Sequence, residues 1–532
     1  MKKRRAAAAL CILMLAVPLL SEGCGSRRSP ESAPPPAPTC ADSSAGSAAA
    51  FQEYLKQINA NHLAVGKLMP QDDITKYEYR LSESDVGFTK KELESLTDYE
   101  KAADPDDSAF VSSAQAKADA KLFFRVLKYC YGPYQYFGGD EAFGKAETVV
   151  LSQLPKGNVS TRALCDILVR NLGFVQDVHV LIGDKRTADF SLYYHSETVE
   201  YEKDAGGYYK IADGKKSYVA TVNGKDPAGF MKLSISPSGK LVYYVGGLYW
   251  NSKQTVYPSA SIRYRSGGAE DCLILSRSVS AIVRGEGLRQ TELDGVPLIS
   301  IRRFQDTGPF DHDCEDFAAS GSALKGKKVL ILDLRGNGGG RDEYAMKWIE
   351  NFTNRKMDFR TDISSVGYDV IGQESRAGAY FYNAVMRSSP KLSENAKKEA
   401  ESALEHYRNG KNEWQIGKCR PSGQSENDSL IFALMDKNNA SSGESAPAFL
   451  SKLKNVVLVG TNSAGCMMGN TEVRFILPNS KLQVSCSNWL RLYNPAVFTE
   501  GEGLKPDIWD ACGTTDRLLA MIRYYRLADS AK

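Results

Sequence analysis

The sequence is poor in histidine and has little excess charge of either sign. Five histidines stand among 532 residues, and no pair has the HExxH spacing that is typical of zinc hydrolases. Lysine and arginine number 67 against 64 aspartates and glutamates, a net charge of +3. Bulk charge therefore gives no reason to expect a nucleic-acid partner or electrostatic membrane binding. We expect no metal and no other cofactor.

Apolar runs long enough to span a membrane are also missing. The one extended apolar run, residues 6–20, follows the basic residues 2–5 and precedes Cys24. This order resembles a bacterial lipoprotein signal, in which the cysteine is lipidated after cleavage. We therefore predict a signal peptide at 1–23 and a lipid anchor at Cys24. The protein is expected to be exported to the bacterial periplasm or cell surface.

No CxxC pair occurs among the eleven cysteines. Without Cys11 in the signal and the lipidated Cys24, nine remain, and an odd number leaves at least one free thiol. Their spacing fixes no disulfide pairing. Most are expected to be small buried apolar residues.

Changes in composition divide the chain into several parts, as its length suggests. We predict the following parts: a signal peptide at 1–23, a tether rich in proline, serine and alanine at 24–50, a helical region at 51–185, a β-rich module at 186–288, and an α/β domain at 289–532 with a helical insertion at about 355–425. A helix is expected after the N-cap Ser160, and residues 329–334 read as a strand covered on both faces.

A glycine-rich turn follows that strand, in the sequence LDLRGNGGG at 332–340. Four glycines let the backbone turn sharply and leave N–H groups unpaired, so they can hold a developing oxyanion. A phosphate is less well supported, because no Gly-Lys-Ser/Thr follows. The structural alternative is an ordinary strand-to-helix turn.

Ser441 stands at the predicted start of a helix, with Glu444 three residues later. This spacing is that of a capping box. It also suits a nucleophilic serine, because free N–H groups at a helix N-terminus stabilise negative charge on a substrate.

Two further segments have an ordinary structural interpretation when they are taken alone. His179 follows Asp177 in an apolar setting and is by default a buried core histidine. Residues 500–508, EGEGLKPDI, describe an exposed turn.

Taken together and in this order, the segments resemble the tail-specific or C-terminal processing proteases, serine peptidases of family S41. The resemblance rests on 332–340, on NASSGE at 439–444, on VLVGTNSAG at 457–465 and on 500–508. It implies a ClpP/crotonase-like α/β core, protein or peptide substrates and no cofactor. In the β-rich module, residues 222–224 resemble a degenerate PDZ-type strand and turn.

One position departs from the family pattern. Many members place a lysine base just after the glycine of the turn that follows the second strand, and here that residue is Cys466. A tricorn-like branch uses histidine and glutamate instead, in a D-x-H segment and in the E-G-x-G turn. The resemblance therefore implies a triad of Ser441, His179 and Glu500.

In the predicted mechanism, Ser441 attacks a peptide carbonyl and His179 takes its proton, while Glu500 orients His179. Backbone N–H groups of Gly339 and Ser442 hold the oxyanion, with Gly338 as the neighbouring candidate and the Ser442 hydroxyl as the rival nucleophile. Two alternatives stay open: a catalytically inactive peptide- or ligand-binding lipoprotein on the same fold, and a thiol hydrolase that uses Cys466. The sequence does not predict the oligomeric state.

Overall fold

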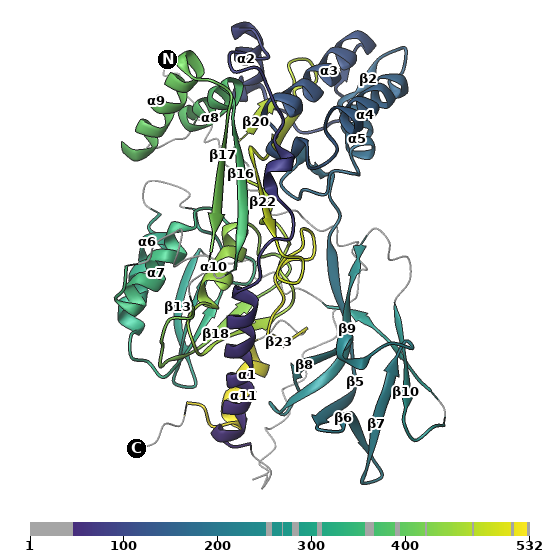
Figure 1. Cartoon of the computed structure of the whole chain (residues 1–532), viewed down its shortest axis with the longest axis vertical. Helices are drawn as coiled ribbons and strands as arrows, with labels where there is room; N and C mark the ends of the chain where they lie inside the picture. Colours follow the sequence, from purple (N-terminus) through teal and green to yellow (C-terminus); the bar gives the residue numbers. More distant parts are fainter. Residues whose placement is uncertain are drawn as a thin grey trace, which may run out of the picture.

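The computed structural model describes residues 46–251, 258–268, 270–278, 287–305, 311–356, 366–388, 394–420, 423–470, 473–511 and 515–528. The predicted signal peptide, the lipid site Cys24 and most of the predicted tether lie outside these ranges. Within them, no helix combines the length and the apolar character that crossing a bilayer requires. The chain has a mixed α/β core with a β-rich module, as the sequence predicts (Figure 1).

Helices dominate the N-terminal part, above the rest of the molecule in Figure 1. They are α1 (Ala48–Gly66), α2 (Lys90–Leu96), α3 (Ser113–Cys130), α4 (Gly139–Gln153) and α5 (Thr161–Asn171), with β1 (Phe110–Val111) paired to β2 (Val159–Ser160). The Ser160 hydroxyl accepts the Ala163 N–H at 3.1 Å, which confirms the predicted N-cap of α5. Only α1 leaves this group and packs lower down, beside α11 (Thr515–Tyr524).

A four-stranded sheet adjoins these helices and carries the segment of His179. Its order is β20 (Val473–Ile476), β21 (Gln483–Cys486), β3 (Leu181–Ile182) and β4 (Lys185–Arg186). Residues of α3, α5 and β20 share one apolar core, for example Phe123, Leu164 and Phe475. Because β3 pairs with β21, His179 is brought beside a part of the chain about 300 residues away.

The core domain is built on five parallel strands. In spatial order they are β14 (Val296–Ile301), β15 (Val329–Asp333), β18 (Leu430–Met435), β19 (Val456–Gly460) and β23 (Ile508–Trp509), with β13 (Leu288–Leu293) antiparallel at the edge. Every residue of β15 is buried, as a strand covered on both faces requires. Leu330 packs with α6 (Asp313–Leu324), α7 (Glu343–Thr353) and α10 (Ser442–Leu450), whereas Ile331 packs with α1 and α11.

The β-rich module continues the same hydrogen-bonded sheet. Its strands are β5 (Ser191–Asp204), β6 (Gly207–Ala212), β7 (Lys215–Val222), β8 (Met231–Ile235), β9 (Leu241–Trp250), β10 (Ser259–Tyr264), β11 (Asp271–Ile274) and β12 (Ser276–Arg277). A parallel pairing of Ser234 with Trp509 joins β8 to β23. At the start of β5, the Ser191 N–H donates to the Gly501 carbonyl at 2.8 Å. The module is thus attached directly to the loop that carries Glu500.

The segment at about 355–425, expected as a helical insertion, contains strands as well as helices. Helices α8 (Arg376–Ser388) and α9 (Glu394–Asn409) lie between β16 (Tyr368–Glu374) and β17 (Glu413–Cys419). These two strands pair with each other, and β16 also pairs with β22 (Trp489–Tyr493). The expected helices are present as α8 and α9, and the two strands were not predicted because β16 pairs with a strand more than 100 residues later.

Candidate active site

Ser441 lies where β18 turns into α10, and its backbone is strained. Its φ of 53° and ψ of −126° are values that favour glycine. The Gly443 N–H donates to the Ala440 carbonyl at 2.9 Å, so Ser441 holds the first central position of a type II′ turn. Such backbone strain costs about 1–3 kcal/mol and is concentrated at functional sites. The side chain is half-buried.

The glycine-rich turn contacts the serine segment backbone to backbone. A Cβ atom on Gly339 would lie 2.7 Å from the Ala440 carbonyl oxygen and 3.0 Å from Cβ of Ser441. A Cβ atom on Gly443 would lie 2.0 Å from the Asn337 carbonyl oxygen. Glycine is therefore required on both sides of this contact, and the two predicted segments come together around Ser441.

The backbone amides that could hold an oxyanion differ in their present partners. The Gly339 N–H donates to Oδ1 of Asn337 at 3.0 Å. Within the part of the chain that the structure describes, the N–H groups of Gly338 and Ser442 have no acceptor. The Ser442 hydroxyl donates to the Gly340 carbonyl at 3.0 Å, which ties the start of α10 to the glycine turn.

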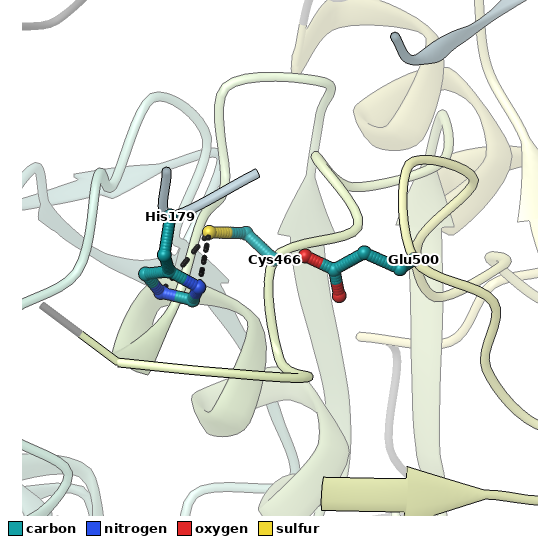
Figure 2. Close-up of side chains that lie close together, drawn as sticks. All are labelled: His179, Cys466 and Glu500. Atoms are coloured by element: carbon teal, nitrogen blue, oxygen red, sulfur yellow. Dashed lines mark hydrogen bonds between the residues drawn. The ribbon is translucent and has the colours of Figure 1, made fainter. Parts of the chain in front are cut away.

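His179 is buried, and its ring faces a thiol. Its Nε2 lies 3.2 Å and its Nδ1 3.5 Å from Sγ of Cys466 (Figure 2). Oδ1 of Asp177 accepts the His179 backbone N–H at 2.9 Å and lies 3.6 Å from ring Nδ1. The hydroxyl of Tyr131 donates to the other oxygen of Asp177 at 2.9 Å. Among the described residues, the ring makes no hydrogen bond to Ser441.

Glu500 approaches the histidine segment through the backbone. Its carboxyl oxygens accept the N–H of Val178 at 3.1 Å and that of Met468 at 3.0 Å. One carboxyl oxygen, Sγ of Cys466 and a ring nitrogen of His179 all lie within 4.8 Å of one another (Figure 2). Burial, reinforced by the charge of Asp177, raises the pKa of Glu500 well above its usual value.

Glu444 links the serine segment to the turn that carries Cys466. Its Oε2 accepts the N–H of Ser441 at 3.2 Å, as the capping spacing predicts, and also the N–H of Cys466 at 2.7 Å. Its Oε1 accepts the Ser463 hydroxyl at 2.5 Å and the Gly465 N–H at 2.8 Å. Burial raises the pKa of this carboxyl despite these bonds.

Sequence reasoning missed Lys437, which lies four residues before Ser441. Its Nζ donates to the carbonyls of Ala464 at 3.1 Å and Ser463 at 3.2 Å, and it stands 4.9 Å from the centre of the Phe190 ring. Burial lowers the pKa of Lys437 to about 8. A lysine two residues after a wholly buried strand was the available sequence signal.

Most of the site residues described above lie in a region that matches a known protein family. Residues 295–509 match the model of peptidase family S41. No curated protein matches the chain.

Three of the solved structures that resemble this chain match most of its length. Mature CPAF is 14% identical, covers 78% of this chain and 98% of its own, and has a TM-score of 0.38. The photosystem II D1 C-terminal processing protease is 13% identical, with coverage of 74% and 92% and a TM-score of 0.32. A lipoprotein from Streptococcus agalactiae is 13% identical, with coverage of 77% and 96% and a TM-score of 0.34. At these TM-scores, the likenesses support no conclusion about the site.

Proposed function

We propose that this chain, whose residues 295–509 belong to peptidase family S41, is an exported serine endopeptidase that cleaves protein or peptide substrates through an acyl-enzyme on Ser441. The observation that carries the proposal is the strained II′ turn at Ser441, in contact with the Gly339 backbone. A strained turn presents a hydroxyl at the end of a strand, and unpaired amides beside it suit an oxyanion.

In the proposed reaction, the Ser441 oxygen attacks the carbonyl carbon and its proton passes to Nε2 of His179. The tetrahedral oxyanion accepts hydrogen bonds from the N–H groups of Ser442 and of Gly339 or Gly338. When the intermediate collapses, His179 gives the proton to the leaving amine, and water then hydrolyses the ester by the same route in reverse. Loss of one oxyanion donor costs about 10²–10³ in turnover.

The base has to leave Cys466 to reach Ser441. The proposed reaction requires the His179 side chain to turn, so that Nε2 leaves the thiol and approaches the Ser441 hydroxyl. Asp177 lies 3.6 Å from Nδ1, so the same turn of the ring has to close this gap for the carboxylate to keep the proton on Nδ1 and leave Nε2 as the base. Glu500 holds the backbone of this segment, and so acts as a positioning residue.

A thiol hydrolase is the second candidate. The sequence alone gives it little support, but the contact between Cys466 and the His179 ring favours it. Nucleophilic cysteines need a lowered thiol pKa. Here burial, reinforced by Glu500 and Glu444, raises the pKa of Cys466 well above its usual value. This thiol is therefore not activated, and we keep Ser441 as the proposed nucleophile. The lysine missing at position 466 does not by itself require the inactive lipoprotein alternative.

The test is covalent labelling of the full chain with a serine-directed fluorophosphonate, followed by turnover of a fluorogenic peptide pool. We expect labelling in the wild type and in Ser442→Ala, and none in Ser441→Ala. Labelling that survives Ser441→Ala but is lost in Ser442→Ala would move the nucleophile by one residue. Turnover that depends on Cys466 alone would establish the thiol candidate.

The proposed lipid anchor at Cys24 is tested by metabolic labelling with a palmitate analogue in a bacterial host. Cys24→Ala should lose the label and the membrane fraction. Retention of both would disprove the anchor.

A further inference from the structure

Three potential metal ligands converge beside the proposed nucleophile. Ligand atoms of His179, Cys466 and Glu500 all lie within 4.8 Å of one another, and the nitrogen and sulfur are already 3.2 Å apart (Figure 2). In a tetrahedral zinc site with bonds of about 2.0–2.3 Å, neighbouring donors are separated by about 3.5 Å. Small movements of the side chains would therefore bring the three donors to bonding distance of one ion.

The outer contacts of these ligands suit a metal site. The His179 ring has a carboxylate, Asp177, 3.6 Å from Nδ1, and Asp177 is itself fixed by Tyr131. With a small approach of Asp177 to Nδ1, this order of groups would become the carboxylate–histidine–metal arrangement, in which Nε2 is the ligand atom. Each oxygen of Glu500 accepts one backbone N–H and keeps a free lone pair.

The charge around the cluster leaves room for a cation. Three carboxyl groups, Asp177, Glu444 and Glu500, interact electrostatically with Cys466, against two basic groups, Arg186 and the buried Lys437. A nitrogen, a sulfur and an oxygen donor together match zinc better than magnesium or calcium, which prefer oxygen alone. The spacing of residues along the sequence does not reveal these three ligands, because each comes from a different segment.

We propose that His179, Cys466 and Glu500 bind one zinc ion, with a fourth position open to water, and that this ion switches the peptidase off reversibly. Binding replaces the thiol proton of Cys466, and any proton on Glu500, with bonds to zinc, and these protons pass to solvent. The metal occupies the Nε2 lone pair that takes the proton of Ser441, so zinc and substrate turnover exclude each other. The inhibition rests on the proposed function, whereas the metal site does not.

Binding is tested on the metal-free full chain carrying Ser441→Ala, with cobalt(II) as the spectroscopic probe. We expect one ion per chain and a thiolate-to-cobalt charge-transfer band. The band should vanish in Cys466→Ser and persist in Cys272→Ser, the matched control at an exposed cysteine. Asp177→Asn should weaken cobalt binding about 10–100-fold. No band, or a band that survives Cys466→Ser while far-ultraviolet circular dichroism shows folded protein, would overturn the site.

Inhibition is tested on the chain with Ser441 intact, as the ratio of peptidase rates with and without zinc. We expect loss of at least nine-tenths of the rate, recovery with a chelator, and a ratio near one in Cys466→Ser. A zinc effect that is the same in Cys466→Ser would overturn the switch. Cobalt binding in a chain that never labels with fluorophosphonate would instead overturn the proposed function and leave the metal site standing.

Discussion

Nε2 of His179 lies 3.2 Å from Sγ of Cys466, so the proposed base contacts a thiol rather than the hydroxyl of Ser441. The sequence resemblance places this thiol at the position where many S41 peptidases carry a lysine. Burial raises the pKa of Cys466, so the sulfur stays protonated. A neutral thiol makes only a weak hydrogen bond to the imidazole, which a Ser441 hydroxyl can replace. Under the proposed function, His179 therefore stands in an inactive orientation that a bound substrate has to reverse.

Removing the thiol should release the ring. In Cys466→Ala, we expect kcat/KM for a peptide to rise several-fold, because His179 no longer has to leave a hydrogen-bonding partner. Cys272→Ala, at an exposed position, should leave the rate unchanged. Complete loss of activity in Cys466→Ala, with fluorophosphonate labelling also lost, would contradict this view of the base.

Lys437 gives a direct test of which group is the base. In Lys437→Met, we expect the rate of acylation to fall less than tenfold, because Nζ donates to carbonyls of the Cys466 turn and so has a structural role. In His179→Ala, the fall should be about 10³-fold or more. Single-turnover labelling rates measure both variants. The opposite ranking would make Lys437 the base.

The strain at Ser441 should be measurable as stability. Glycine adopts a φ of 53° freely and alanine does not. We therefore expect Ser441→Gly to unfold at a higher urea concentration than Ser441→Ala, by about 1 kcal/mol. Both variants lack the hydroxyl, so the comparison isolates the backbone. Equal midpoints would show that the turn relaxes without the side chain.

Gly443 should tolerate no side chain. In Gly443→Ala, the new Cβ would lie 2.0 Å from the Asn337 carbonyl oxygen, and we expect a loss of about 3 kcal/mol of stability. Gly338→Ala is the control in the same turn, because its Cβ meets no atom within 4 Å. Urea unfolding of both variants decides the point. A Gly443→Ala chain as stable as the control would mean that the two segments separate easily.

Acid should weaken the turn through Asp333, next to the glycine-rich segment. Burial alone would raise the pKa of Asp333, but bonds from Arg335 and Arg302 outweigh it and lower the pKa to about 2. The stabilisation is therefore complete above about pH 4 and is lost as the pH falls toward 2, a loss of about 2 kcal/mol. Urea midpoints of the wild type and Asp333→Asn should converge across this range. A constant difference would exclude the carboxylate as the cause.

Local features of the fold and of the site were predictable from the sequence because they depend on short segments. The buried strand before the glycines and the N-cap Ser160 follow from patterns within a few residues, and the structure has both. The spacing of Ser441 and Glu444 also predicted the hydrogen bond from the Ser441 N–H to the Glu444 carboxylate. What the sequence does not contain is the conformation of Ser441, since no local rule places a serine where glycine is favoured.

Long-range pairings explain what was not predictable. The strands at 368–374 and 413–419 were missed because their stability comes from each other and from Trp489–Tyr493. The contact of His179 with Cys466 depends on the pairing of β3 with β21. Likewise, the role of Lys437 depends on carbonyls more than 25 residues away.

The hydrogen bond from Ser191 to Gly501 has a mechanical consequence. The β-rich module begins twelve residues after His179 in the chain, and it is tied to the residue that follows Glu500. A polypeptide tail that pulled on the module would load both flanks of the imidazole at once. A displacement of the module would thus be transmitted to the two chain segments that flank His179.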